Sequence, residues 1–177
     1  TGLTVVQWEQ SSSPDTYGYI VYVTDPVTNW LVELDTIWGA NNVTYSYLED
    51  YDAGPLNYTV AAFDSCPSPL GAPFNLSARD PNLQATIYLE AIPAICGGLI
   101  DLEWTPYVGW QVAQYEVFTS LNQGVWQSTP VGLEQFFSFQ ANAGESIRFF
   151  VKATSVDGEI SFSRIRNVDV EVANLPD

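Results

Sequence analysis

Short runs of alternating apolar and polar residues follow one another along the whole chain, with the period of two that is typical of half-buried β-strands. Residues that form turns separate the runs, for example at 11–14, 25–26, 39–42 and 53–55, and no window carries a helical stripe of apolar residues. The pattern predicts strands at residues 3–9, 17–24, 30–37, 43–49, 57–64 and 72–78, and again at 85–91, 99–105, 113–120, 125–129, 135–140, 147–155 and 160–172. Short strands with a turn about every 8 to 12 residues favour a two-sheet sandwich.

The sequence repeats itself once. In each half a Trp precedes a Tyr by 11 residues, and a later aromatic residue precedes a second Trp by 8 residues. These residues are Trp8, Tyr19, Tyr22 and Trp30 in the first half, and Trp104, Tyr115, Phe118 and Trp126 in the second. We therefore predict two tandem domains, residues 1–80 and 81–177, joined near residues 78–85. The first copy lacks an obvious first strand, as expected of a chain cut just before its second strand.

The charge of the chain excludes several classes of function. It holds 21 acidic and 5 basic residues, for a formal net charge of −16, and it has no His. Without an imidazole there is no Ser-His-Asp triad, Cys-His pair or His-bound metal. Five cations are too few for a phosphate-binding patch, so we expect no nucleic-acid partner. No apolar run reaches about 18 residues, so we expect no membrane insertion, and we expect a monomer.

Two aromatic positions per copy resemble a known fold family. Trp8 and Trp104 stand where fibronectin type III domains keep a buried Trp on their second strand. Tyr58 and Phe149 stand on the penultimate strand, each ahead of a Val-x-Ala string. The resemblance covers nearly the whole chain and implies an all-β fold of two tandem immunoglobulin-like/fibronectin type III-like β-sandwiches.

A narrower resemblance spans the junction of the two copies. Asp64–Cys66, Thr86–Leu89, Cys96 and Trp104–Trp110 are similar, in that order, to tandem modules of large surface proteins of Bacteroidetes. Those proteins end in a gliding-motility-associated, type IX secretion C-terminal sorting domain. The resemblance implies a protein that is secreted or held at the cell surface and is linked to gliding motility or adhesion.

The two cysteines leave three interpretations open: a metal or redox pair, a disulfide, or two buried thiols. Cys66 and Cys96 are 30 residues apart and lack Cys-x-x-Cys spacing, which disfavours a metal site. If the protein is exported, the oxidising environment outside the cell favours the disulfide. The bridge would need Cα atoms about 6 Å apart, and therefore modules that pack closely at a bent junction.

The acidic residues predict a solvated, repellent surface. The alternative is calcium, which binds carboxylate oxygens. The weak candidates are Glu49 with Asp52, and Asp101 with Glu103, two acids that share one face of a strand. We expect no other cofactor and no catalytic residues, because among 21 acids some carboxylate pair meets the spacing of a glycosidase by chance.

Tryptophan is the better candidate for ligand binding, because an exposed indole stacks on sugar rings. The carbohydrate-binding candidates are Trp30, Trp38, Trp110 and Trp126, whereas Trp8 and Trp104 are expected in the cores. The alternative is that Trp30 and Trp126 only cover the edge of the sandwich.

These observations support a non-catalytic structural and interaction module of a large exported cell-surface protein. The alternative functions are a carbohydrate-binding module and an accessory domain of a polysaccharide-degrading enzyme. The expected partners are an extracellular polysaccharide or another cell-surface protein.

Overall fold

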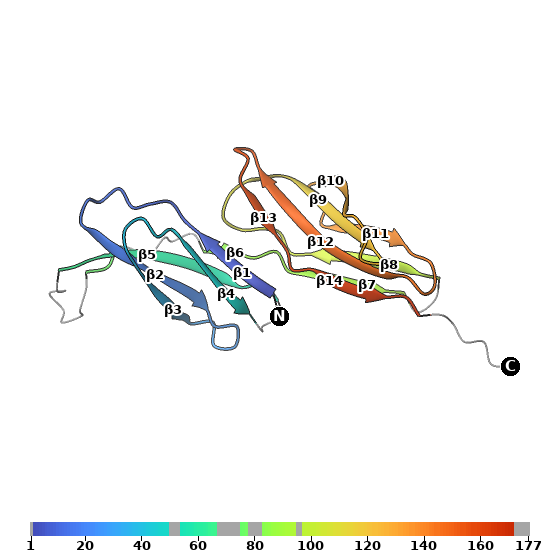
Figure 1. Ribbon diagram of the computed structural model, residues 1–177, viewed down its shortest axis with the longest axis horizontal. Coiled ribbons are helices and arrows are strands. Elements are labelled where there is room, and N and C mark those ends of the chain that lie inside the picture. Colours follow the sequence, from blue (N-terminus) through green and yellow to red (C-terminus); the bar gives the residue numbers. More distant parts are fainter. Residues whose placement is uncertain (1, 50–53, 67–74, 78–82, 95–96, 172–177) are drawn as a thin grey trace. The chain divides into compact units, whose positions relative to one another are not determined.

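All of the regular structure in the described part of the chain is β-strand. The computed structural model describes residues 2–49, 54–66, 75–77, 83–94 and 97–171 (Figure 1). The chain divides into two compact units, unit 1 (Thr1–Ala85) and unit 2 (Thr86–Asp177). No helix in the described segments is long and apolar enough to cross a membrane.

Unit 1 consists of two antiparallel sheets. Its described strands are β1 (Gly2–Gln7), β2 (Thr16–Thr24), β3 (Leu31–Trp38), β4 (Thr44–Glu49), β5 (Asn57–Asp64) and β6 (Gln84–Ala85). β1 pairs with β4, and the second sheet has the order β3-β2-β5-β6. Strand β2 is buried on both faces because Tyr19 and Val21 point toward one side while Ile20 and Tyr22 point toward the other.

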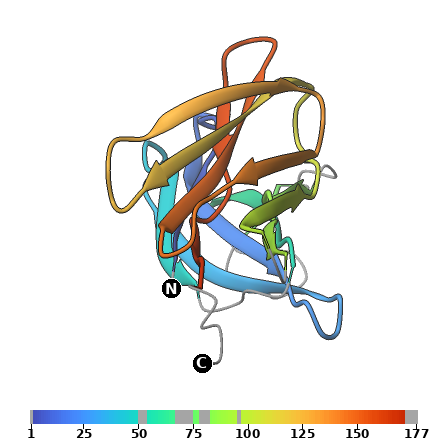
Figure 2. The same cartoon turned by 90° about the vertical axis from the view of Figure 1, so that its right-hand side faces the viewer.

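Unit 2 also has two sheets, whose strands can be followed in Figure 2. Its described strands are β7 (Leu89–Pro93), β8 (Leu99–Trp104), β9 (Val112–Leu121), β10 (Gln127–Gly132), β11 (Phe136–Gln140), β12 (Ser146–Ser155), β13 (Ile160–Phe162) and β14 (Arg166–Asp169). One sheet has the order β11-β8-β7. The other has the order β10-β9-β12-β13, with β14 also paired to β12.

The two units have the same strand order. β1, β2, β3, β4 and β5 of unit 1 correspond to β8, β9, β10, β11 and β12 of unit 2. In unit 2 the first, second and fifth strands form one sheet and the remaining strands form the other, which is the arrangement of immunoglobulin-like and fibronectin type III-like sandwiches. The predicted fold class is therefore confirmed. The described residues of unit 1 contain no counterpart of β7, so its first sheet has two strands.

The core of unit 2 follows from the alternation in β12. Ile147, Phe149, Val151 and Ala153 are fully buried, whereas the residues between them face outward. They pack with Ile100 and Leu102 of β8 and Val117 of β9. Burying one such side chain contributes about 1.5–3 kcal/mol, so this interleaved set is the main source of stability in unit 2.

Two predicted strands need correction, and a third lies mostly outside the described residues. The strand expected at 85–91 is divided, because Ala85 pairs with Asn57 in unit 1 and β7 begins only at Leu89. The strand expected at 160–172 is two strands, because Ser163 lies between them and uses its backbone and hydroxyl to bond Val151. Of the strand expected at 72–78, only residues 75–77 are described, and Leu76 forms an isolated bridge to Phe63.

Candidate functional site

Each unit holds one Trp against one Tyr in the same geometry. The ring centroids of Trp8 and Tyr19 lie 5.3 Å apart at 62°, and those of Trp104 and Tyr115 lie 6.0 Å apart at 65°. Each phenol oxygen accepts a hydrogen bond from the backbone N–H three residues after the Trp, at 2.9 Å in unit 1 and 3.0 Å in unit 2. Trp104 is 5% exposed and belongs to the core of unit 2, whereas Trp8 is half-buried and lies against the buried Tyr19.

Trp30 and Trp126 occupy matching positions, directly before β3 in unit 1 and directly before β10 in unit 2, but they differ in exposure. Trp30 is 76% exposed, whereas Trp126 is half-buried. The guanidinium of Arg148 covers the Trp126 ring at 5.0 Å from its centroid, and Phe150 meets the ring edge-on at 4.7 Å. The sequence alignment of the two repeats places Asn57 where unit 2 has Arg148, so unit 1 lacks the cation that covers this ring.

The turn that carries Trp30 is held by Asp25. The Asp25 carboxylate accepts hydrogen bonds from the backbone N–H groups of Val27 and Thr28, at 3.0 and 2.7 Å, and from the Thr28 hydroxyl at 2.8 Å. The backbone N–H of Asp25 donates to the Trp30 carbonyl oxygen at 2.8 Å. The bonds from Thr28 lower the pKa of Asp25. An exposed indole on an ordered turn loses little freedom when it binds a ligand.

Trp38 and Trp110 are less available than Trp30. Trp38, at the end of β3, is half exposed and meets Tyr17 and Phe63 edge-on at 5.6 and 5.3 Å. Trp110 is half-buried, lies against Tyr107 with 4.0 Å between ring centroids, and packs on the core of unit 2. Trp30 and Trp38 belong to unit 1, and Trp110 and Trp126 belong to unit 2.

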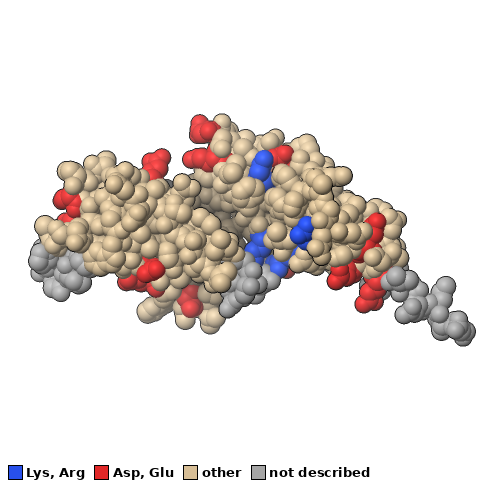
Figure 3. Space-filling model, in the orientation of Figure 1, with Lys and Arg blue, Asp and Glu red and all other residues tan. Residues whose placement is uncertain are grey.

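Sequence analysis missed an aromatic and cationic surface on the outer face of unit 2. Phe118 and Phe150 face each other across β9 and β12 and stack at 4.5 Å. Lys152 lies 5.7 Å from the Phe118 centroid and pairs with Glu116. The sequence pattern could have revealed this surface, because Arg148, Phe150 and Lys152 alternate with the core residues of β12 and so share its outward face. Figure 3 shows Lys and Arg side chains in blue among dispersed acidic ones in red.

The predicted disulfide stays a prediction. Cys66 is exposed and has no disulfide partner among the residues that the structure describes, and its N–H donates to the Asp64 carboxylate at 2.8 Å. Cys96 lies outside the described residues.

The calcium candidates that the structure describes form no metal-binding cluster. Asp101 and Glu103 share the outward face of β8, on either side of the buried Leu102, and Asp101 accepts a hydrogen bond from the Ser138 hydroxyl at 2.6 Å. Glu49 ends β4, and Asp52 lies outside the described residues. Within the described segments, no group of three or more Asp, Glu, Cys or His side chains is placed to hold a metal ion.

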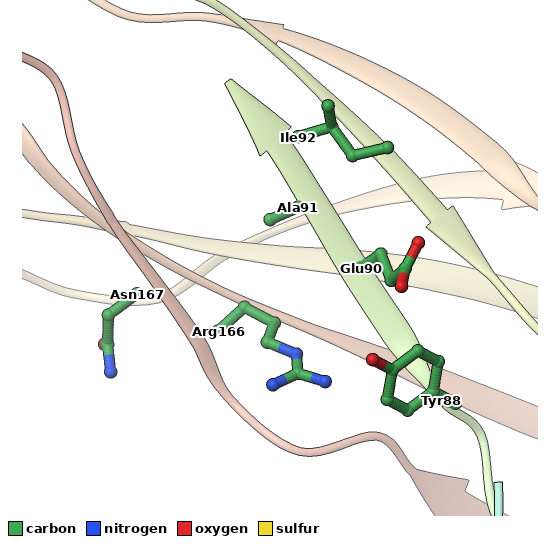
Figure 4. Close-up of a pocket in the computed structure, with 6 residues that line it drawn as sticks. All are labelled: Tyr88, Glu90, Ala91, Ile92, Arg166 and Asn167. Atoms are coloured by element: carbon green, nitrogen blue, oxygen red, sulfur yellow. The ribbon is translucent and has the colours of Figure 1, made fainter. Parts of the chain in front are cut away.

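A groove of about 320 Å³ lies beside β7 and β14 (Figure 4). The described residues that line it are Tyr88, Glu90, Ala91, Ile92, Arg166 and Asn167. The Arg166 guanidinium lies 5.1 Å from the Tyr88 ring centroid, and its Nε donates to the carbonyl oxygen of Leu89. Glu90 is the single carboxylate among the described lining residues, so this part of the groove does not offer the pair of carboxylates that glycoside hydrolysis needs.

No protein-family model matches the sequence, and no curated protein matches it. Among solved structures the chain is similar to the FN1–FN3 domains of chicken CNTN1, with a TM-score of 0.40 and 13% sequence identity. The match covers 96% of this chain and 62% of that chain. The strand order of the two units defines the class of protein on its own: tandem fibronectin type III-like β-sandwich modules.

Proposed function

We propose that this chain is a non-catalytic structural and interaction segment of a large exported cell-surface protein. The observation that carries the proposal is the repetition of one sandwich, with the same Trp–Tyr contact and the same phenol hydrogen bond in both units. Folded modules in series act as a spacer between the segments at their two ends. The acidic surface of the modules opposes association with other acidic chains. The sequence resemblance to Bacteroidetes surface proteins supports a role in gliding motility or adhesion.

Single-molecule pulling tests the structural role. Two separate unfolding events are expected, each releasing roughly 300 Å of chain, because an extended residue spans about 3.3–3.6 Å and the units hold about 90 residues each. The same chain with Trp104→Ala should lose resistance only in one of the two events, since Trp104 serves unit 2 alone. A single event, or none, would contradict two modules that resist force independently.

Carbohydrate binding is the second candidate, and the exposure of Trp30 favours it. An indole that is 76% exposed on a turn ordered by Asp25 offers a flat apolar surface to a sugar ring. Trp38, which is half exposed, is the next candidate. An extracellular polysaccharide would then be the partner, and calcium would be needed only if carboxylates such as Asp101 and Glu103 took part.

A pull-down against soluble and insoluble polysaccharides, with and without calcium, tests this candidate. Saturable binding to one glycan should weaken about tenfold or more in Trp30→Ala. Val27→Ala is the matched control, because Val27 lies in the same turn and is 89% exposed but has no aromatic ring. Equal loss in both variants, or no binding to any glycan by the folded chain, would reject carbohydrate binding and leave the structural role.

A further inference from the structure

The aromatic and cationic surface of unit 2 is centred on Phe150. Its ring stacks on that of Phe118 at 4.5 Å, and it meets Trp126 at 4.7 Å and Phe162 at 5.9 Å, both edge-on. Phe162 stands opposite Lys152 across β12 and β13. It is 50% exposed, and the other three rings are half-buried. The four rings therefore form one patch that contacts solvent, and such patches mark interaction sites.

The faces of these rings are already covered. Phe118 and Phe150 lie face to face, with 7° between their planes. The Arg148 guanidinium lies over Trp126, and the Lys152 ammonium lies 5.7 Å from the Phe118 centroid. The stacked rings are spaced like neighbouring strands, which lie about 4.7–4.9 Å apart, so they stand upright on the sheet with their edges outward. A sugar ring stacks on the flat face of an aromatic ring, whereas an apolar side chain packs against ring edges.

Arg148 is a cation on this surface for which the structure describes no anion. The other cation, Lys152, pairs with Glu116, whereas Arg148 forms no ion pair with a described carboxylate. Its Nη2 donates to the Ser120 hydroxyl at 3.0 Å, and its Nε is enclosed without a hydrogen-bond partner among the described residues. Because a guanidinium carries five N–H donors, its two terminal amino groups keep donors for a carboxylate.

The spacing of these groups along β12 matches that of an extended peptide. Arg148 and Phe150 are neighbours on the outward face of the strand, so they lie about 6.6 Å apart along it, as do residues i and i+2 of any extended chain. We propose that this surface docks an extended segment of another polypeptide chain, in which an acidic residue and a large apolar residue are two positions apart. The carboxylate accepts hydrogen bonds from Arg148, and the apolar side chain packs against the edges of Phe150 and Phe162.

This inference rests on the interaction role proposed above and names the partner. The net charge of −16 repels acidic chains at a distance and disfavours a second copy as the occupant. Salt screens charges that are more than about 8–10 Å apart, so the contact with Arg148 decides the sign of the local interaction. An acidic segment therefore gains affinity where it reaches Arg148 and is repelled by the acidic surface elsewhere.

The test is a nuclear magnetic resonance titration of the whole chain with the end-blocked peptide Ser-Asp-Ser-Leu-Ser-Leu-Ser. It should shift the indole N–H signal of Trp126 and the amide signals of Phe150 and Phe162. The matched peptide with Asn in place of Asp should bind about tenfold or more weakly, because it lacks the charge that Arg148 recognises. Equal affinity of the two peptides would overturn the proposal. So would the absence of shifts at millimolar peptide and also when the peptide is joined behind Asp177 through a long Gly-Ser linker.

Two pairs of variants separate docking from folding. Arg148→Gln should weaken peptide binding about tenfold or more, whereas Arg148→Lys should retain part of the binding because it keeps the charge. Glu116→Gln should strengthen binding about twofold or more, because it leaves the Lys152 ammonium without its carboxylate. Glu134→Gln is the matched control, since it changes the net charge equally but lies in the turn before β11. Binding that survives Arg148→Gln, or that rises equally in both Glu variants, would overturn the proposal.

Polygalacturonate is the probe for an anionic polysaccharide as the occupant. It should leave the signals of Trp126, Phe150 and Phe162 unchanged. If it shifts them and the peptide does not, the occupant is a glycan and the proposal is overturned. The pulling experiment reports on the structural role alone, so two unfolding events without peptide binding would reject this docking surface and leave that role standing.

Discussion

The guanidinium of Arg148 lies over the ring of Trp126, with 5.0 Å between its central carbon and the ring centroid. Its Nη2 donates to the hydroxyl of Ser120 at 3.0 Å, and Ser120 is the residue opposite Arg148 across β9 and β12. The Ser120 hydroxyl in turn donates to the carbonyl oxygen of Gly124 in the turn before β10 at 2.8 Å. One cation therefore joins an edge turn to the two central strands of unit 2.

Replacing Arg148 should destabilise unit 2 and expose Trp126. For Arg148→Ala we expect a loss of about 0.5–2 kcal/mol in the free energy of unfolding, the range of a cation–π contact. Urea unfolding and the chemical shift of the Trp126 indole N–H are the measurements. The free energy of unfolding of Arg148→Lys should lie between those of the parent chain and Arg148→Ala, because an ammonium keeps the charge but not the planar face. A Trp30→Ala variant serves as control and should change stability by less than about 0.5 kcal/mol. Equal effects of the Arg148 and Trp30 variants would contradict the assignment.

The contrast between Trp30 and Trp126 shows where sequence analysis stops. The spacing of the repeat predicts that both Trp residues stand at the same point of the fold. The structure places Trp30 directly before β3 and Trp126 directly before the corresponding strand β10. Their exposure depends on Arg148, which is 22 residues from Trp126 and reaches it only through the pairing of β9 with β12. Aligning the repeats places Asn57 against Arg148. Without the register of β9 and β12, however, the sequence does not show that this difference decides the exposure of the Trp ring.

The fold itself was predictable because it depends on local alternation. β12 alternates buried and half-buried residues without interruption, and the sequence predicts it at 147–155. The break between β13 and β14 was not predictable, because Ser163 interrupts the strand through bonds to Val151, whose proximity is set by tertiary structure. The same holds for β6, which joins unit 1 by pairing with β5.

Removing the phenol hydroxyls should cost the two units different amounts. The Tyr19 hydroxyl accepts from Ser11 at 2.9 Å and donates to Ala40 at 3.0 Å, whereas the Tyr115 hydroxyl accepts from Tyr107 at 3.0 Å. We expect Tyr115→Phe to cost unit 2 about 1 kcal/mol, and Tyr19→Phe to cost unit 1 about twice that, since each hydrogen bond contributes about 0.5–1.5 kcal/mol. Chemical denaturation of each variant measures both values, and the reverse order would contradict the hydrogen-bond assignment.

A methyl group at Gly18 should not fit. A Cβ at Gly18 would lie 2.4 Å from the Ile37 carbonyl oxygen and 2.7 Å from the Phe63 ring. The second repeat has Gln114 at this position. We expect Gly18→Ala to destabilise unit 1 by about 1–3 kcal/mol or more, the cost of overpacking, as measured by thermal unfolding. Gly18→Ala combined with Phe63→Leu should recover part of the loss if the ring is the obstacle, and a combined loss equal to the sum of the single losses would show that it is not.

Tyr107 should make unit 2 sensitive to alkaline pH. Burial is the larger cause and the nearby Glu159 carboxylate the smaller one, and together they raise the pKa of Tyr107 from 10.0 to about 12. A pKa that is raised in the folded state means that the folded state favours the neutral phenol. The stability that this preference contributes is therefore fully present below pH 10 and is lost as the pH rises toward 12.

We expect the urea midpoint of unit 2 to fall between pH 10 and 12, and to fall less in Tyr107→Phe, which has no proton to lose. Glu159→Gln provides the second arm. It should lower the pKa of Tyr107 but leave it above 10, because burial remains when the charge is gone. The difference between each variant and the parent chain isolates the contribution of Tyr107. The chain holds 10 Tyr residues, so the ultraviolet titration of the folded parent chain minus that of folded Tyr107→Phe measures the Tyr107 phenol. A Tyr107→Phe variant that loses as much stability as the parent chain over this interval would show that another group causes the alkaline loss.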